Sequence, residues 1–339
     1  MAVVADLPAE LRDGLAAALD AVPVERLAAS VRRLIEQYRT GPPAGSQSTA
    51  PILATDLDVA AYAAYRMPAT FAATRGALGH LREVLPDFEP ASLVDIGGGT
   101  GAAAWAATAT YPGLSSVTVL DQVTGALAFG ARLAGRSAAL ALRAAEWRPW
   151  RIPPDATVSA TVPAADLVTM SYLLGELTAP ARTAIVARAA QSAAVVVVVE
   201  AGTPAGYART VEARAALIGY GLTVLAPCPH QRPCPLAGTR DWCHFAARVN
   251  RSPLHRRLKA ATLGHEDEKY SYVAAVHGGG APAPGRILRH PQFRKGLVTL
   301  QVCQESDGVT PVPVSKRHGD LYRKARDAEW GDAWPAAVP

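Results

Sequence analysis

The chain has 339 residues, of which 50% are hydrophobic, 19% are charged and four are cysteine. A chain of this length buries at least one full core and usually forms two or three units. It contains no run of about 18 uncharged apolar residues, and its first residues lack the basic start and apolar middle of an export signal. We therefore expect a monomeric cytoplasmic protein without a membrane span, whose cysteines are thiols or metal ligands rather than disulfides.

The net charge of +5 is distributed unevenly along the chain. Residues 201–339 contain 19 Lys and Arg against 11 Asp and Glu, whereas the part before them is slightly acidic. A basic surface of this kind favours a polyanionic partner such as nucleic acid. A solvated basic face without any partner is the alternative, and the charge count alone does not separate the two.

Apolar residues at helical spacing predict a helical region over residues 1–85. Leucine or valine recurs every three to five positions in its first half: Leu7, Leu11, Leu15, Leu19, Val24, Leu27, Val31 and Leu34. Pro23 separates two helices there, and the Gly, Pro and Ser of residues 40–51 indicate a linker. A further helical stretch spans residues 56–85. We expect these helices to form a cap that frames a pocket.

From Ser92 onward, short apolar runs alternate with Ala-rich helical segments, which is typical of a parallel sheet covered by helices on both faces. The predicted strands span Ser92–Ile96 and residues 116–120, 166–172 and 194–199, and a poorly marked third strand lies somewhere within residues 138–144. The fold class is therefore α/β, with a Rossmann-like core over residues 86–202.

Beyond residue 202 the composition changes, because Pro, Cys, His and Arg concentrate between residues 226 and 259. We interpret residues 203–269 as an insertion rich in cysteine and basic side chains. Two further strands, over residues 270–276 and Leu297–Gln304, are predicted to close the sheet within residues 270–305. The polar residues 306–339 are predicted to form a tail or a small addition.

A glycine-rich turn follows the first predicted strand. Asp95 stands at the end of the strand, and the glycines Gly97, Gly98, Gly99 and Gly101 come next. Glycine lets the backbone turn tightly and approach a ligand, and the following helix offers free N–H groups. A dinucleotide fingerprint places its third glycine three residues after the second, whereas this spacing is that of S-adenosylmethionine enzymes. The turn therefore predicts a class I methyltransferase sheet that binds S-adenosylmethionine.

Asp121 ends the second predicted strand, where an acidic side chain typically accepts hydrogen bonds from a ribose diol. This position supports a nucleoside-containing ligand at the glycine-rich turn. The alternative is that the glycines only form a turn and that Asp121 caps a helix.

Catalytic residues are weakly indicated. Many amino-methylating enzymes carry an Asn/Asp-Pro-Pro-aromatic sequence after the fourth strand, and this chain has Ser-Tyr-Leu-Leu-Gly-Glu over residues 171–176 instead. Tyr172 and Glu176 are the candidates to line the acceptor pocket, with Glu176 as a base. A carboxylate at a helix start without any chemical role is the alternative for Glu176.

The four cysteines all lie in the C-terminal part of the chain. Cys228, Cys234 and Cys243 fall in one short loop-rich stretch, and Cys303 comes at the end of a predicted strand. Prolines beside the first two stiffen the loop. Four thiolates can bind a tetrahedral zinc ion or a [4Fe-4S] cluster, and nearby histidines could replace cysteine in a zinc site. The spacing matches neither zinc ribbons nor bacterial ferredoxins, so both metals remain open, as do four unligated buried thiols.

A dense basic segment follows the third cysteine. Its candidate phosphate-binding side chains are Arg248, Arg251, Arg256, Arg257 and Lys259. If residues 245–262 form one helix, several of them share a face. Such a face suits RNA phosphates, although a solvated charged face without a partner is the alternative.

Several of these motifs together carry a family resemblance: residues 95–101, 166–177, 199–206, 226–230, 234–236, 241–245 and 269–272. Over residues 55–330 the chain resembles the methyltransferase-like assembly factors of the mitochondrial small ribosomal subunit and their bacterial homologues. The resemblance implies that Cys228, Cys234, Cys243 and Cys303 hold a [4Fe-4S] cluster and that the partner is 16S-type ribosomal RNA of the small subunit. Ala201 replaces a proline that the family usually has.

Two functions of different classes follow. In the first, the protein is an S-adenosylmethionine-dependent methyltransferase of small-subunit ribosomal RNA, with the cluster as a structural staple. In the second, it is a non-catalytic factor that binds RNA during ribosome assembly. The intact glycine-rich turn favours the first, and the missing catalytic sequence favours the second. A zinc-binding methyltransferase of small molecules is a third possibility.

Overall fold

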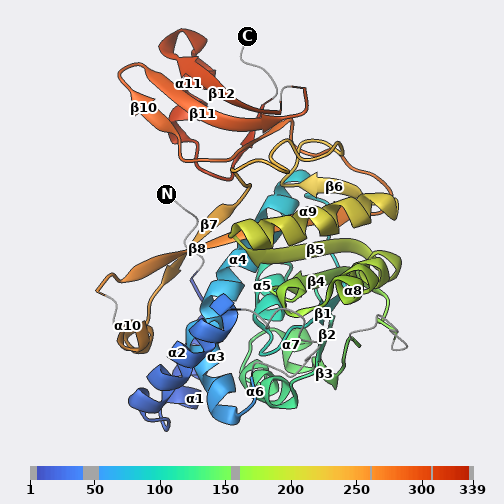
Figure 1. The fold of residues 1–339 in the computed structure, drawn as a ribbon, viewed down its shortest axis with the longest axis vertical. Coiled ribbons are helices and arrows are strands. Elements are labelled where there is room, and N and C mark those ends of the chain that lie inside the picture. The colour runs from blue at the N-terminus through green and yellow to red at the C-terminus, as the bar shows by residue number, and fades with distance from the viewer. Residues whose placement is uncertain (1–5, 41–52, 154–160, 260–261, 307, 336–339) are drawn as a thin grey trace.

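The computed structural model describes residues 6–40, 53–153, 161–259, 262–306 and 308–335. These residues form an eight-stranded sheet flanked by helices and a separate five-stranded sheet near the C-terminus. In Figure 1 the five-stranded sheet lies above the eight-stranded sheet, and the N-terminal helices lie at the lower left of the molecule. Most of the predicted linker falls in residues 41–52, outside the described residues. No helix in the described part is long and apolar enough to cross a membrane.

The eight-stranded sheet has the Rossmann-like order that the sequence predicts. Its strands run in the order β3-β2-β1-β4-β5-β8-β6, with β7 paired to β8. The first five strands are parallel, and β8 is antiparallel to its neighbours β5 and β6. The strands are β1 (Ser92–Ile96), β2 (Ser116–Asp121), β3 (Glu146–Pro149), β4 (Ala165–Ser171), β5 (Ala193–Ala201), β6 (Thr223–Ala226), β7 (Phe245–Asn250) and β8 (His265–Val276).

Strand β5 explains how the two faces of the sheet are covered. Its five consecutive valines are all buried, as expected of a strand covered on both sides. Val195, Val197 and Val199 belong to one core, and the alternate Val196 and Val198 belong to the other. The first core contains α4 (Met67–Val84), α5 (Ala102–Thr110), α6 (Thr124–Ala134) and α7 (Leu140–Arg143), and the second contains α8 (Ala179–Ser192) and α9 (Pro204–Gly219).

The N-terminal helices are α1 (Ala9–Leu19), α2 (Val24–Thr40) and α3 (Asp56–Tyr65), followed directly by α4. Helix α3 begins with a capping box, in which Thr55 and Asp58 satisfy each other's backbone N–H groups. Helix α4 packs on the sheet, since Met67 and Phe71 are fully buried in the first core. Part of the predicted helical cap, helix α4, therefore covers the sheet. Helices α2 and α3 form a smaller core of their own.

The third strand lies later than the sequence predicts. Residues 138–144 were expected to be a strand, but they contain helix α7, and β3 follows at Glu146–Pro149. The prediction is wrong because the Ala- and Leu-rich stretch favours a helix. Strand β3 is a short edge strand whose side chains are mostly exposed, so it gives no apolar signal.

The basic segment after the third cysteine is also different from the prediction of one helix over residues 245–262. It forms strand β7 and a short helix, α10 (Pro253–Lys259), before β8. Burial along β7 alternates from residue to residue, which is the period of a strand. Helix α10 packs against α2 and α3, with Leu258 in their small core.

The second sheet, which we call the C-terminal sheet, contains the predicted strand Leu297–Gln304, and residues 308–335 belong to it as a small addition and not as a tail. It contains β9 (Gly285–Ile287), β10 (Gln292–Arg294), β11 (Leu297–Gln304), β12 (Gly308–Ser315) and β13 (Ala333–Trp334), with helix α11 (Asp320–Asp327) packed against it. Leu300 and Trp334 are buried in a core that belongs to this sheet. The prediction that Leu297–Gln304 closes the first sheet is therefore wrong, whereas residues 270–276 do join it within β8.

Replacing Phe71 with alanine should lower the free energy of unfolding by about 3–5 kcal/mol, because it leaves a cavity in the first core. The matched change Phe293→Ala should alter it by less than about 0.5 kcal/mol, because that ring is 59% exposed on β10. Urea unfolding followed by circular dichroism measures both. Equal losses in the two variants would contradict this description of the core.

Candidate functional site

The glycine-rich turn lies between β1 and α5, at the carboxyl ends of the central strands, where Rossmann-like sheets bind ligands. Gly97, Gly99 and Gly101 have φ angles of 70°, 52° and 83°, which other residues rarely adopt. A Cβ at Gly97 would lie 2.6 Å from the Leu173 side chain, and one at Gly101 would lie 2.5 Å from Trp147. The turn therefore needs glycine at these positions.

Asp121, at the end of β2, holds the turn from the side. One carboxylate oxygen accepts a hydrogen bond from the Gly99 N–H at 2.9 Å, and the other accepts one from the Val123 N–H at 2.8 Å. Burial raises the pKa of Asp121, and these donors oppose the shift. Because each carboxylate oxygen can accept more than one hydrogen bond, the backbone contacts leave capacity for a ribose diol.

Asp95, on β1, packs against the turn at Gly98. Its side chain is fully buried, and one oxygen accepts a hydrogen bond of 2.8 Å from the Thr169 hydroxyl. The other oxygen has no hydrogen-bond partner within the described residues, and a Cβ on Gly98 would lie 2.4 Å from it. Burial raises the pKa of Asp95 to about 7. This buried carboxyl group therefore leaves no room for a side chain at position 98.

The candidate catalytic residue Tyr172 directly follows β4 and has a φ angle of 58°, which is strained for a residue with a side chain. Its hydroxyl donates a hydrogen bond of 2.8 Å to Glu268 of β8. Arg66 donates to both oxygens of the same carboxylate at 3.0 and 3.2 Å, and its guanidinium lies 4.9 Å from the centre of the Tyr172 ring. Burial, followed by the charge of Glu268, raises the pKa of Tyr172 well above its usual value. The phenol therefore keeps its proton.

Two acidic residues near this position did not emerge from the sequence motifs as site residues. Glu268 holds Tyr172, and the buried Glu200 accepts hydrogen bonds of 2.8 Å from the Leu174 N–H and from Arg209. Glu200 therefore shapes the loop after β4. The other catalytic candidate, Glu176, is exposed on the short 3-10 helix Leu174–Glu176 of this loop. The sequence could have indicated Glu200 as a site residue, because it is an acidic residue directly after five consecutive valines of a buried strand.

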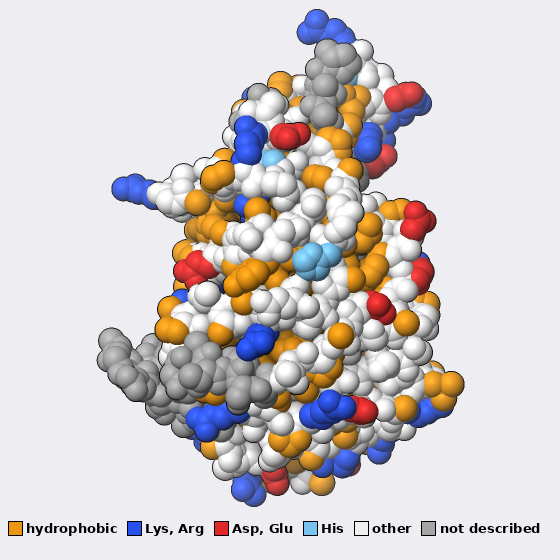
Figure 2. Space-filling model, turned by 90° about the vertical axis from the view of Figure 1, so that its right-hand side faces the viewer, with side chains coloured by type: hydrophobic (Ala, Val, Ile, Leu, Met, Phe, Trp, Pro, Cys, Tyr) orange, Lys and Arg blue, Asp and Glu red, His pale blue; other side chains and the backbone are white. Residues whose placement is uncertain are grey.

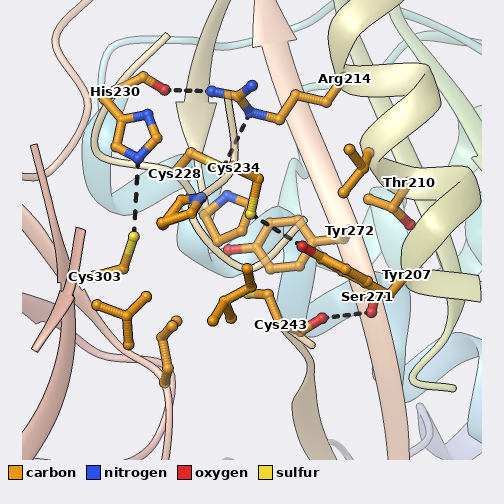
Figure 3. A pocket seen from close by; sticks show the side chains of 16 residues that line it. Tyr207, Thr210, Arg214, Cys228, His230, Cys234, Cys243, Ser271, Tyr272 and Cys303 are labelled. Atoms are coloured by element: carbon orange, nitrogen blue, oxygen red, sulfur yellow. Dashed lines mark hydrogen bonds between the residues drawn. The ribbon is translucent and has the colours of Figure 1, made fainter. Parts of the chain in front are cut away.

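All four cysteines line one cavity, which we call the cysteine cavity (Figure 3). Cys228 and Cys234 come from the loop after β6, Cys243 precedes β7, and Cys303 lies on β11 of the C-terminal sheet. Helix α9 and strand β8 supply the opposite wall. The cavity therefore joins the two sheets, and it brings the distant cysteine to the other three as the sequence prediction requires.

Polar side chains contact three of the sulfurs. Arg214 donates from Nε to the Cys228 sulfur at 3.3 Å, and the Tyr207 hydroxyl lies 3.1 Å from the Cys234 sulfur. The Nε2 atom of His230 lies 4.0 Å from the Cys303 sulfur. These contacts surround the thiols with hydrogen-bonding groups.

Ionised thiolates would be costly in this cavity without a positive charge. All four cysteines are free thiols. Burial, followed by the neighbouring cysteines, raises the pKa of Cys243 well above its usual value and that of Cys303 to about 12. Within the described residues, no three His, Cys, Asp or Glu side chains converge closely enough to hold a single metal ion.

The predicted phosphate-binding residues are separated by the fold. Arg248 on β7 pairs with Asp267 at 2.9 Å, and Arg251 pairs with Glu266 at 2.8 Å. Arg256 and Arg257 are exposed on α10, while the Lys259 side chain lies outside the described residues. Acidic residues of β8 therefore neutralise two of the five cations.

The family model described as "Mitochondrial small ribosomal subunit Rsm22" matches residues 56–335. The human "Ribosome assembly protein METTL17, mitochondrial" is 28% identical over 304 residues, which cover 82% of this chain. The chain spans 62% of the length of that relative.

Solved structures of methyltransferases are also similar. A putative RNA methyltransferase from Pyrococcus horikoshii is 14% identical with a TM-score of 0.39, covering 73% of this chain and 96% of that one. Human N-acetylserotonin methyltransferase in complex with S-adenosylmethionine is 14% identical with a TM-score of 0.41, covering 78% and 70%.

Replacing Asp95 with asparagine should flatten the dependence of stability on pH. The folded state keeps this proton up to about pH 7, whereas an unfolded chain releases it near about pH 3.9. The folded state therefore binds more protons in this window, and wild-type stability should fall as the pH rises through it. Urea midpoints across the window measure the slope, with the exposed Asp87→Asn as control. An unchanged slope in Asp95→Asn would contradict the raised pKa.

Proposed function

We propose that this chain, which belongs to the Rsm22 family of the mitochondrial small ribosomal subunit, is a non-catalytic assembly factor of a small ribosomal subunit. On this proposal it binds S-adenosylmethionine or its demethylated product at the glycine-rich turn and a [4Fe-4S] cluster in the cysteine cavity. The observation that carries the proposal is the gathering of four cysteines from distant segments around one cavity between the two sheets. Family membership supports the ribosomal partner.

The nucleoside ligand is supported by the turn and by Asp121. The N–H groups at the start of α5 face the carboxyl edge of the sheet, where a helix start favours ligand acceptors. Asp121 lies beside the turn with spare acceptor capacity for a ribose diol. S-adenosylmethionine has hydrogen-bond acceptors that could bind these N–H groups and a ribose diol that could donate to Asp121.

An iron–sulfur cluster suits the cysteine cavity better than zinc. A zinc ion takes four donors at about 2.0–2.3 Å from one point, which would bring the sulfurs into mutual contact. A [4Fe-4S] cluster binds each cysteine through a different iron, so its ligands stand further apart. Four sulfurs that line one cavity from separate loops and strands suit a group with several points of attachment. A bound cluster would supply the positive iron charge that stabilises the thiolates.

The surroundings of Tyr172 support binding without methyl transfer. A general base must be within reach of the acceptor and must lack the proton that it removes. The Tyr172 hydroxyl is protonated and donates to Glu268, and Arg66 neutralises Glu268. The runner-up is an RNA methyltransferase, which the intact glycine-rich turn favours.

Wild-type protein should bind S-adenosylmethionine in calorimetry, and Asp121→Ala should weaken the affinity about tenfold or more through loss of charged hydrogen bonds. The control is Asp87→Ala, at an exposed position before β1. Incubation with methyl-labelled cofactor and small subunits from a strain lacking the protein should leave the RNA unlabelled. Label transfer that Gly99→Arg abolishes would overturn the non-catalytic role, and absence of binding would remove the cofactor.

Protein purified without oxygen should contain iron by elemental analysis, and Cys303→Ser should lose it because one ligand is missing. Thr210→Val, in the wall of the same cavity but without a sulfur, should retain it. Wild-type protein with zinc instead of iron would contradict the cluster, and protein with neither metal would contradict any metal in the cavity.

A further inference from the structure

The β10–β11 hairpin projects from the C-terminal sheet, on the side of the molecule away from the N-terminal helices (Figure 1). Strand β10 lies at the edge of its sheet. The hairpin turn contains Lys295 and Gly296, and the Lys316 N–H donates to the Gly296 carbonyl at 3.1 Å. We call the exposed side chains gathered here the hairpin tip: Phe293, Arg294, Lys295, Lys316 and Arg317.

The four cations of the hairpin tip have no ion-pair partner within the described part of the chain, in contrast to Arg248 and Arg251. No acidic residue occurs between residues 291 and 304. The pairing of Arg294 with Leu297, and of Leu297 with Ser315, holds the two pairs of cations on adjacent turns. Figure 2, viewed from the right-hand side of Figure 1, shows both basic and acidic side chains at the end of the molecule that the C-terminal sheet forms.

Phe293 adds an aromatic surface to these charges. Its ring is 59% exposed, which makes it one of few large apolar side chains outside the core. The residue pairs with Val298 of β11, so the sheet fixes the position of its backbone. Because side chains alternate along a strand, the ring and the Arg294 side chain leave opposite faces of the edge strand β10. An exposed aromatic ring and unpaired cations on one edge hairpin can bind unpaired nucleotides, because bases stack on the ring and phosphates contact the cations.

From this arrangement we infer that the hairpin tip is a binding surface for single-stranded RNA. The inference rests on the proposed function, which supplies an RNA partner, and it adds which surface and which form of RNA. A duplex hides its base faces and would use the cations alone. The basic segment that the sequence predicted is a weaker candidate for RNA binding. Arg248 and Arg251 are paired with acidic residues there, and α10 packs on α2.

Binding is measured by fluorescence anisotropy with a labelled, unstructured single-stranded RNA and with its duplex, over a range of salt concentrations. Arg294→Ala/Lys295→Ala should reduce the slope of log affinity against log salt by about 1.4 for the single strand, or about 0.7 for each lost phosphate contact. The matched control is Arg26→Ala/Arg32→Ala, which removes the same charge from exposed positions on α2.

Phe293→Ala should weaken single-strand binding about tenfold with little change in salt slope, and Phe293→Trp should restore it because the ring is retained. Equal losses in both double variants, or equal effects of Phe293→Ala on single strand and duplex, would overturn the inference.

A parallel measurement uses a 16S ribosomal RNA transcript. If the wild type binds the transcript and the hairpin variants bind equally well, the inference fails and the proposed function stands. If the wild type does not bind it, the proposed function fails as well.

Discussion

Strand β8 is the element on which the rest of the arrangement depends. It enters the parallel sheet in the opposite direction, between β5 and β6, and its first half extends beyond them to pair with β7. Glu268 on this strand holds Tyr172 and Arg66 beside the end of β4. Four residues later, Tyr272 lines the cysteine cavity, and its hydroxyl is 2.8 Å from His80 of α4. One strand therefore fixes both the loop beside the glycine-rich turn and a wall of the cysteine cavity.

The two regions on either side of β8 handle buried charge differently. Beside the turn, the Glu268 carboxylate is compensated by Arg66 and by the Tyr172 hydroxyl, so it needs no ligand to be stable. In the cysteine cavity, Arg214 contacts the Cys228 sulfur, and burial, followed by the neighbouring cysteines, raises the pKa of Cys243 and of Cys303. An external cation would therefore stabilise the cavity far more than it would stabilise the loop after β4. This difference is the physical reason that the proposed cluster is placed in the cysteine cavity and not beside Tyr172.

The sequence predicts the elements whose signal is local. Ser92–Ile96 and the valines of β5 are buried on both faces, and the glycines after Asp95 require their own backbone angles, so composition identifies them. The sequence does not predict strand β3 correctly, because this strand is short and exposed at the edge of the sheet. The C-terminal sheet was not predicted, because the alternating pattern of β11 indicates a strand but does not indicate which strands pair with it. The gathering of Cys303 with the other cysteines was predictable from the resemblance, whereas the pairing of Arg248 with Asp267 depended on which strands lie side by side.

The glycine-rich turn is also weaker evidence for catalysis than its sequence suggests. Gly97 and Gly101 are required by contacts with Leu173 and Trp147, which are parts of this chain, so packing alone would retain them without any ligand. At Gly99 the nearest atom to an added Cβ would be the Asp121 carboxylate, 3.7 Å away. This position and Asp121 therefore border the space that a nucleoside would occupy. Packing within the chain therefore accounts for Gly97 and Gly101, whereas Gly99 and Asp121 are the positions at which a ligand would make the difference.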